Sequence, residues 1–329
     1  MARPILVTGG AGYIGSHAAK ALAKAGYLPV TYDNLGHGHR AAVRWGPLEE
    51  GDLLEPARLD AVLRKWRPEA VLHFAGLISV GESVENPGLY YQHNLVASLN
   101  LAQAMRAHDI GRIVFSSTAA VYGTPDVVPI PETAPMRPLN PYGASKAMVE
   151  AVLADFGQAH GLRSVALRYF NAAGADPDGE TGEAHEPETH LIPLALDALE
   201  GRRGPLTIYG DDYPTPDGTC LRDYVHVSDL ATAHVQALEY TGTCEAGTSA
   251  AFNLGTGTGY SVRQVLDSIG RASGKTVPVR LGPRRPGDSS ALVADPARAR
   301  AILGWKPELS DIDMIVQTAL AWISREEAA

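Results

Sequence analysis

Residues 3–18 read RPILVTGGAGYIGSHA, and this stretch decides the fold of the first half of the chain. An apolar run typical of a buried strand ends at Thr8, and a helical pattern begins near residue 14. The turn between them has the spacing G-x-G-x-x-G from Gly10 to Gly15. Glycine suits this turn because the backbone must bend sharply, approach a pyrophosphate closely and let the helix lie against the strand. The stretch therefore predicts a strand, turn and helix that bind a dinucleotide at the amino end of the helix.

Strands and helices alternate through the first half of the sequence. Five runs rich in β-branched residues are typical of strands buried on both faces: 3–8, 28–32, 70–74, 112–116 and 164–169. Four helical patterns lie among them: 14–25, 55–65, 86–108 and 141–160. Parallel neighbouring strands need crossover connections of this length, and such crossovers are right-handed. The sequence thus predicts an α/β protein with a Rossmann-type, doubly wound parallel sheet.

An acidic residue at the end of the second predicted strand specifies the nucleotide. Asp33 stands where a carboxylate accepts hydrogen bonds from the adenosine ribose hydroxyls and repels a 2′-phosphate. No arginine follows it directly, since the next one is Arg40. This pattern favours NAD over NADP.

The sequence after about residue 170 is richer in turns and shorter elements. We therefore expect an NAD-binding Rossmann domain at 1–170 and a smaller C-terminal α/β lobe that binds the substrate at 171–329. This division leaves open that some of the late segments belong to the first domain.

Composition excludes several classes of protein. The 329 residues include 28 basic and 37 acidic side chains, a net charge of −9, so we expect no nucleic acid partner. Cys220 and Cys244 are too few for a cysteine zinc site or a disulfide framework, which fits a reducing cytoplasm. No apolar stretch approaches about 20 residues and no charged leader precedes the first strand, so we expect neither a membrane span nor secretion.

A tyrosine and a lysine lie one helical turn apart. Tyr142 and Lys146 are four residues apart in a predicted helix, so they project from one face. A free phenol has a pKa near 10 and must lose about 3 units of pKa to act as a base at neutral pH. A nearby ammonium and the positive nicotinamide ring of NAD favour its ionised form. The strand before this helix ends at Ser116-Ser117-Thr118, which places hydroxyl groups at the edge of the sheet where ligands bind.

These motifs belong to a longer set of matching segments: Gly9 to His17, Asp33 to Leu35, Gly51 to Asp52, His73 to Ser83, Ser116 to Gly123, Pro141 to Lys146, Arg168 to Asn171, Tyr209 to Asp229 and Pro283 to Asp288. Together they resemble the extended short-chain dehydrogenase/reductase family, and specifically its sugar-nucleotide epimerase branch. The resemblance implies bound NAD and interconversion of UDP-galactose and UDP-glucose by transient oxidation at C4, rotation of the 4-keto sugar and re-reduction.

The resemblance also implies roles for individual residues. Tyr142 would take the proton of the sugar 4-hydroxyl, Lys146 would hold the nicotinamide ribose, and Thr118, a serine in most members, would bridge to the same hydroxyl. The implied cofactor-binding residues are Gly9, Gly12, Tyr13, Ile14, Gly15, Asp33, Asn34, Leu35, Gly38, Asp52, Leu53, Phe74, Ala75, Gly76, Asn94, Ser116, Tyr142, Lys146 and Phe170. Ile78 stands where many members have a lysine that touches the cofactor, so that contact is not expected here.

For the substrate, a UDP-hexose, the resemblance implies contacts from Thr118, Tyr142, Asn171, His190, Leu191, Thr207, Tyr209, Arg222, Arg285, Asp288 and Leu292. Forked arginine donors suit the diphosphate of such a substrate. Leu292 matches a gate that is tyrosine in members restricted to unsubstituted hexoses. Leucine leads to the hypothesis that UDP-GlcNAc and UDP-GalNAc are also interconverted.

Several alternatives follow from the same residues. A 4,6-dehydratase needs an Asp-Glu pair where this chain has Ala119-Ala120, which argues against that reaction. A 4-epimerase of a pentose or uronate UDP-sugar stays open, as does a non-catalytic NAD-binding regulatory protein, although the latter has no need of Tyr142 and Lys146.

Two further expectations concern metals and assembly. His185 and His190 are five residues apart around a proline, which does not match a helical H-E-x-x-H site, so no metal is expected. Segment 141–160 has apolar residues on more than one face, and members of the family pair through this helix and the one before it. We therefore expect a homodimer.

Overall fold

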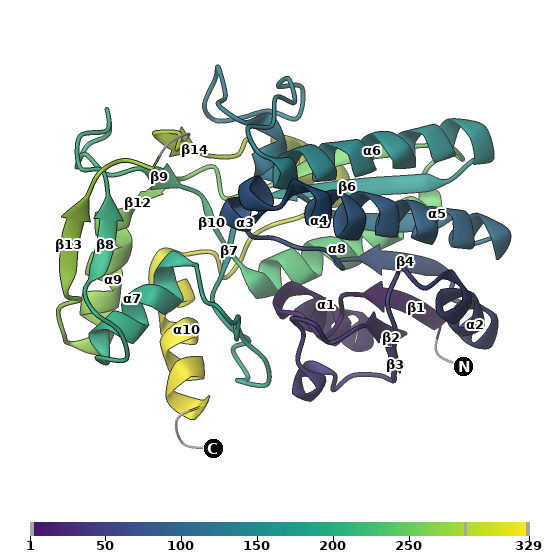
Figure 1. The fold of residues 1–329 in the computed structure, drawn as a ribbon, viewed down its shortest axis with the longest axis horizontal. Coiled ribbons are helices and arrows are strands. Elements are labelled where there is room, and N and C mark those ends of the chain that lie inside the picture. Colours follow the sequence, from purple (N-terminus) through teal and green to yellow (C-terminus); the bar gives the residue numbers. More distant parts are fainter. Residues whose placement is uncertain (1–2, 286–287, 327–329) are drawn as a thin grey trace.

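Apolar strands buried on both faces build the centre of the protein (Figure 1). The computed structural model describes residues 3–285 and 288–326. Its seven-stranded sheet has the order β11-β6-β5-β4-β1-β2-β3, and all of its pairings are parallel. The strands are β1 (Arg3–Thr8), β2 (Tyr27–Asp33), β3 (Leu48–Glu50), β4 (Ala70–His73), β5 (Arg112–Thr118), β6 (Arg163–Tyr169) and β11 (Ser249–Leu254). The predicted Rossmann-type, doubly wound parallel sheet is confirmed.

Helices cover both faces of this sheet (Figure 1). On one face, α1 (Tyr13–Lys24) packs against α8 (Val227–Thr243). The other face carries α2 (Pro56–Trp66), α5 (Ala97–Ala107) and α6 (Pro141–His160). Side chains alternate along the strands accordingly: Ile5 lies in the core with α1 and α8, and its neighbour Leu6 lies in the core with α2 and α5.

Two local features position the helices that approach the site. The predicted helix at 86–108 is divided into α4 (Pro87–Tyr90), a π-type segment at Tyr91–Val96 and α5, and wider turns of this kind often occur at functional sites. Helix α6 begins at Asn140, whose side-chain Oδ1 accepts a hydrogen bond of 2.9 Å from the Gly143 N–H, with Pro141 in the first turn. This start fixes which face of α6 carries Tyr142 and Lys146.

The C-terminal lobe is a smaller α/β unit, seen at the left of Figure 1. Three small sheets contribute: β7 (Asn171–Ala173) with β10 (Tyr224–His226); β8 (Leu206–Tyr209) with β13 (Val279–Gly282); and β9 (Leu221–Arg222) between β12 (Tyr260–Ser261) and β14 (Ala291–Leu292). Helices α7 (Leu191–Leu199), α9 (Val262–Ser273) and α10 (Ile312–Glu326) enclose one apolar core with them. The domain division at residue 170 stays a prediction, and α8 and β11 lie on the first sheet.

The remaining helical segments are short. They are η1 (Arg40–Ala42), α3 (Val80–Glu85), η3 (Ala119–Tyr122) and η4 (Ala299–Leu303). Within the described residues, no helix has both the length and the apolar character that are needed to cross a bilayer.

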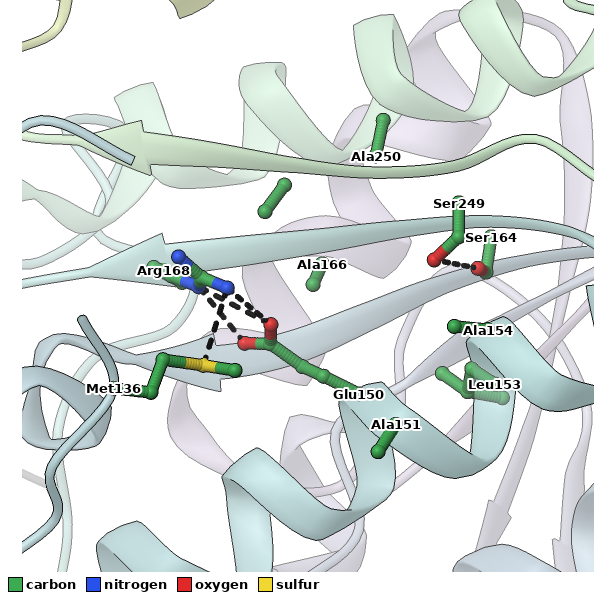
Figure 2. A pocket seen from close by; sticks show the side chains of 11 residues that line it. Met136, Glu150, Ala151, Leu153, Ala154, Ser164, Ala166, Arg168, Ser249 and Ala250 are labelled. Carbon is green, nitrogen blue, oxygen red and sulfur yellow. Dashed lines mark hydrogen bonds and ion pairs between the residues drawn. The ribbon is translucent and has the colours of Figure 1, made fainter. Parts of the chain in front are cut away.

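A buried ion pair ties α6 to the sheet (Figure 2). The Arg168 guanidinium on β6 donates two hydrogen bonds to the Glu150 carboxylate on α6, with Nε to Oε1 at 3.0 Å and Nη2 to Oε2 at 2.5 Å. The same carboxylate accepts a hydrogen bond from Ser117 Oγ of β5 at 2.5 Å. Both charged side chains are more than nine-tenths buried and line a pocket of about 240 Å³ beside β11. A charged pair buried in this way holds α6 in register with β5 and β6.

Replacing Glu150 by alanine should destabilise the protein strongly. The change leaves the Arg168 guanidinium buried without its carboxylate, which costs about 3–5 kcal/mol of unfolding free energy. Urea denaturation of the wild type and of Glu150→Ala measures this loss. Asp155→Ala, an exposed acidic position on the same helix, is the matched control and should change the free energy by less than about 0.5 kcal/mol. Equal effects of the two substitutions would contradict the role given to the buried pair.

Candidate active site

The amino end of α1 is built to accept an anion. Gly12 is its N-cap, without a side-chain hydrogen bond, and the first turn carries no acidic residue. The first N–H groups of a helix lack partners within the helix, so they carry partial positive charge. A Cβ at Gly9, whose φ is +72°, would lie 2.5 Å from the backbone nitrogen of Ala75, and a Cβ at Gly15 would lie 2.2 Å from the Gly9 oxygen. The uncapped helix and its close backbone approach fit the diphosphate of a dinucleotide.

Asp33 is held directly against this turn. Its Oδ2 accepts a hydrogen bond of 2.9 Å from the Ala11 N–H, and its Oδ1 accepts one of 2.9 Å from the Leu35 N–H. Burial raises the pKa of this carboxyl above its ordinary value, while the two backbone donors oppose the rise. The structure thus brings the predicted acidic partner to the glycine turn.

A second acidic side chain lies beside the same loop. Asp52 Oδ2 accepts a hydrogen bond of 2.7 Å from Asn34 Nδ2, and its backbone oxygen accepts one from the Tyr32 hydroxyl at 2.8 Å. Leu53, next in the chain, is buried. Gly38 lies against the glycine turn, since a Cβ there would be 2.8 Å from that of Ala11. These residues form one group of predicted cofactor positions at the ends of β2 and β3.

The loop after β4 is joined to α6 by one buried amide. Asn94, in the π-type segment, accepts a hydrogen bond from the Leu77 N–H at 2.7 Å through Oδ1. Its Nδ2 donates to the Leu77 oxygen at 3.0 Å and to Ser145 Oγ at 3.1 Å. Close by, a Cβ at Gly76 would lie 2.9 Å from Asn94 Oδ1 and 3.6 Å from Lys146 Nζ. Asn94 therefore places the predicted loop 74–76 next to the predicted catalytic helix.

Lys146 is a buried cation at the end of β5. Its Nζ donates a hydrogen bond of 3.0 Å to the backbone oxygen of Ser116 and lies 4.9 Å from the centre of the Phe115 ring. Burial lowers the pKa of this lysine to about 8. No carboxylate among the described residues lies within ion-pair distance of it. The ammonium therefore stays charged at neutral pH and is not neutralised by a partner.

Tyr142 and Thr118 are brought together by α6 and the end of β5. Burial raises the pKa of the Tyr142 phenol above its ordinary value, and the influence of the Thr118 side chain opposes the rise. Thr118 Oγ1 also accepts a hydrogen bond of 3.1 Å from the Ala120 N–H, which orients its hydroxyl. In the protein alone the phenol is thus protonated, and further positive charge is needed to make it a base.

Residues of the C-terminal lobe gather into a polar group around β8, β9 and β14. Arg222 pairs across the sheet with Leu292, and its Nη2 lies 3.4 Å from Asp288 Oδ1. The Arg285 guanidinium lies 4.0 Å from the centre of the Tyr209 ring on β8. On the same strand, Thr207 Oγ1 accepts a hydrogen bond from Arg280 Nε at 2.9 Å. Six of the predicted substrate residues therefore lie in contacting pairs or on neighbouring strands.

Leu292 faces toward the first lobe. It packs, together with Phe170, against an apolar cluster of Val121, Tyr122 and Ile130. Val121 and Tyr122 belong to η3, the turn that directly follows Thr118. The predicted gate position and the predicted catalytic threonine thus lie at the same side of the molecule. Asn171 begins β7 immediately after Phe170.

The His190 side chain has different partners. Its Nδ1 lies 2.7 Å from Glu183 Oε1 and 2.9 Å from Glu188 Oε1. Burial alone would lower the pKa of His190, but the two carboxylates outweigh it and raise the pKa to about 10. The side chain therefore points into an acidic cluster, while Leu191 begins α7. None of the contacts found for His190 in the described part of the chain joins it to Arg222, Arg285 or Asp288.

Other contacts near the site are not marked by any sequence motif. The Tyr169 hydroxyl hydrogen-bonds to Ser116 Oγ, and Ser145 joins α6 to Asn94. The Tyr13 hydroxyl, at a predicted cofactor position, donates a hydrogen bond of 2.5 Å to the Gly174 oxygen of the second lobe. In the sequence, only their positions point to Ser145 and Tyr169. Ser145 precedes Lys146, and Tyr169 ends β6, which neighbours β5.

Comparisons with known proteins agree with this geometry. The UDP-glucose 4-epimerase of Rhizobium leguminosarum bv. trifolii is 54% identical over 318 residues, which cover 97% of this chain and 96% of that protein. The crystal structure of UDP-glucose 4-epimerase from Brucella ovis in complex with NAD is 53% identical, with a TM-score of 0.95 over 97% of this chain and 98% of that one. The UDP-Glc/GlcNAc 4-epimerase from Campylobacter jejuni is 39% identical, with a TM-score of 0.86 over 98% of this chain and 99% of that one.

The family comparison covers the glycine turn, the Tyr142 and Lys146 pair and the central sheet. The sequence model of the NAD dependent epimerase/dehydratase family matches residues 5–255. The chain belongs to the NAD dependent epimerase/dehydratase family.

Proposed function

We propose that this protein interconverts UDP-galactose and UDP-glucose with NAD as its bound cofactor. The observation that carries the proposal is the meeting of Tyr142, Thr118 and Lys146 at the end of β5 in a fold that has an NAD-type glycine turn. Relatives that share about half of their residues with this chain over nearly its full length are UDP-glucose 4-epimerases, and one was solved with NAD.

The residues divide the chemistry between them. Bound NAD supplies a reversible hydride acceptor for C4 and a positive charge. The phenol oxygen of Tyr142 takes the proton of the 4-hydroxyl and returns it after the keto sugar has rotated. Thr118 orients that hydroxyl through its own, and Lys146 contributes positive charge that favours the phenolate. The net reaction consumes no second substrate.

In this proposal the protein holds the substrate by its nucleotide. Arg222 and Arg285 supply forked donors for a diphosphate, and Asp288 and Tyr209 hold these two arginines from the other side. The hexose must present both faces of C4 in turn, so tight binding of the sugar itself would oppose the reaction. Asn171, Thr207 and Leu191 complete the proposed nucleotide contacts. The contact expected from His190 stays a prediction, and its side chain is engaged by Glu183 and Glu188.

The simplest test is turnover without an added oxidant or reductant. Purified protein incubated with UDP-galactose should produce UDP-glucose, detected by anion-exchange chromatography of the nucleotide sugars. A protein that retains NAD but converts neither UDP-hexose would instead fit a binding protein or an epimerase of pentose or uronate sugars, and UDP-pentose and UDP-uronate substrates in parallel separate these cases.

Removing the phenol should abolish most of the activity. Tyr142→Phe keeps the ring but not the proton acceptor, so kcat should fall by about 10²- to 10⁴-fold while NAD content and UDP affinity stay unchanged. Steady-state kinetics measures kcat and UDP affinity, and the absorbance of released cofactor measures the NAD content. Tyr27→Phe, at the far end of β2, is the matched control and should retain full activity. A Tyr142→Phe protein with wild-type kcat would overturn the assigned role.

The side chain at position 292 should set the tolerance for an acetamido group. We infer that Leu292 leaves room for UDP-GlcNAc and UDP-GalNAc, because a leucine at this position near η3 is smaller than the tyrosine of the restricted members. Leu292→Tyr should lower kcat/KM for the acetylated pair by about tenfold or more and change that for the unsubstituted pair by less than about threefold. Leu292→Ala should retain both activities. Absence of wild-type turnover of UDP-GlcNAc would refute the inference.

We also propose a homodimer in the cytoplasm. Helices α3 and α6 and the π-type segment pack together, and they expose Val80 (46%), Val84 (62%), Val96 (36%) and Met148 (43%). Apolar side chains that are gathered in this way mark a protein interface.

Light scattering after gel filtration at about micromolar concentration should therefore give the mass of a dimer. Met148→Asp should shift the protein toward the monomer, because it puts a charge into the interface. Val127→Asp, an exposed apolar position in a loop outside these helices, should leave the dimer intact. A wild-type monomer would refute the proposal.

A further inference from the structure

The loop before α7 gathers two imidazoles and two carboxylates. Glu183, His185, Glu188 and His190 each offer one ligand atom, and these four atoms all lie within 4.8 Å of one another. The spacing of the two histidines excludes a helical H-E-x-x-H site only, because a loop brings residues together by a different path. The cluster is also separate from the residues to which the proposed reaction assigns proton transfer.

Hydrogen-bond distances already join the ligand atoms of the four side chains. Glu183 Oε1 lies 3.0 Å from His185 Nδ1 and 2.7 Å from His190 Nδ1, and the two imidazole rings are 5.2 Å apart. Glu188 Oε1 lies 2.9 Å from His190 Nδ1 and is oriented by the backbone N–H groups of Thr189 and His190. In a tetrahedral zinc site with bonds of about 2.0–2.1 Å, neighbouring ligand atoms are about 3.3 Å apart. Only small side-chain movements separate the cluster from that geometry.

The carboxylates of this cluster are compensated by its own imidazoles and not by a lysine or arginine. The Glu183 side chain is only 8% exposed and that of Glu188 is 15% exposed. Within residues 3–285 and 288–326, neither carboxylate has a lysine or arginine within ion-pair distance. A neighbouring acidic cluster of Asp176, Asp178 and Glu180 has the buried ammonium of Lys20 at 2.6–2.7 Å. Desolvated carboxylates need such compensation.

We propose that Glu183, His185, Glu188 and His190 bind one divalent transition-metal ion of the zinc class. Imidazole nitrogen with carboxylate oxygen suits zinc and its neighbours, whereas magnesium and calcium prefer oxygen ligands alone. Two carboxylates balance the charge of a dication, and an imidazole binds it in the neutral form, so any proton held by the imidazoles leaves as the metal binds. Four protein ligands also fill a tetrahedral shell, which is the arrangement of a structural site without an open position for substrate.

The surroundings of the cluster indicate what the ion would do. His39 Nε2, in the loop after β2, lies 2.7 Å from the Ala184 oxygen, and the Tyr13 ring meets His185 edge-on at 6.0 Å. From the other side, Trp322 Nε1 of α10 donates a hydrogen bond of 3.1 Å to the backbone oxygen of Glu183. The metal loop therefore lies between the cofactor side of the first lobe and the last helix of the second. The bound ion fixes this loop and stabilises the folded protein.

Calorimetric titration with Zn²⁺ tests the proposal on tag-free protein that has been treated with a chelator and dialysed. The wild type should bind one Zn²⁺ per chain and gain about 3 °C or more in Tm, while Mg²⁺ should have no effect. Substituting Co²⁺ should give the intense visible absorption of a tetrahedral site. These readouts do not depend on epimerase activity, so failure here is distinct from failure of the proposed function.

Two ligand variants and one control locate the ion. His185→Ala and Glu188→Gln should each weaken Zn²⁺ binding by at least about tenfold, since even the loss of a group that only supports a ligand costs about 10- to 100-fold. His160→Ala, an exposed histidine at the end of α6, should bind as the wild type does. Retained NAD in each variant verifies the fold. Absence of stoichiometric binding by the wild type, or wild-type affinity in both ligand variants, would overturn the proposal.

Discussion

The candidate site depends on one buried charge, the ammonium of Lys146. Water is replaced around it by the Ser116 carbonyl oxygen and the face of the Phe115 ring, and no carboxylate among the described residues neutralises it. Burial makes this arrangement costly, as the lowered pKa of about 8 records. Under the proposed function this cost has a chemical use, because an ammonium without a counter-ion retains its field for the phenol of Tyr142, which burial alone would keep protonated.

Helix α6 can hold that charge in place because its next turn is fixed by a different kind of interaction. Glu150 lies four residues after Lys146. Its carboxylate accepts hydrogen bonds from Ser117 of β5 and Arg168 of β6, and the Arg168 guanidinium compensates its negative charge. The helix thus carries an unpaired cation and a paired anion on successive turns. The paired anion sets the register of the helix, and the unpaired cation is free to act on the site.

Local sequence predicted the parts of this site that local geometry determines. The glycine turn, Asp33 and the face shared by Tyr142 and Lys146 follow from turn chemistry and helical spacing, and the structure brings them to one edge of the sheet. The strands β3 and β11 were not predicted, because they gain their stability from neighbours in the sheet. The Glu150 network and the His190 cluster depend on residues that only the tertiary fold brings into contact. The sequence suggested His190 for the substrate, and no local pattern showed that Glu183 and Glu188 surround its ring.

Contacts of helix α1 also join the two lobes. Helix α1, which begins at the glycine turn, is tied to residues 174–185 by the Tyr13 hydroxyl on the Gly174 oxygen, by Ser16 on Thr181 at 2.9 Å and by Lys20 on Asp176 at 2.6 Å. These cross-lobe contacts therefore come from the helix that follows the glycine turn. The arginines proposed for the diphosphate lie on β9 and in the loop after β13, away from this junction. A rigid cofactor side and a separate hold on the nucleotide leave the sugar as the only part of the substrate that is free to turn, and that freedom is the condition for returning a hydride to the opposite face of C4.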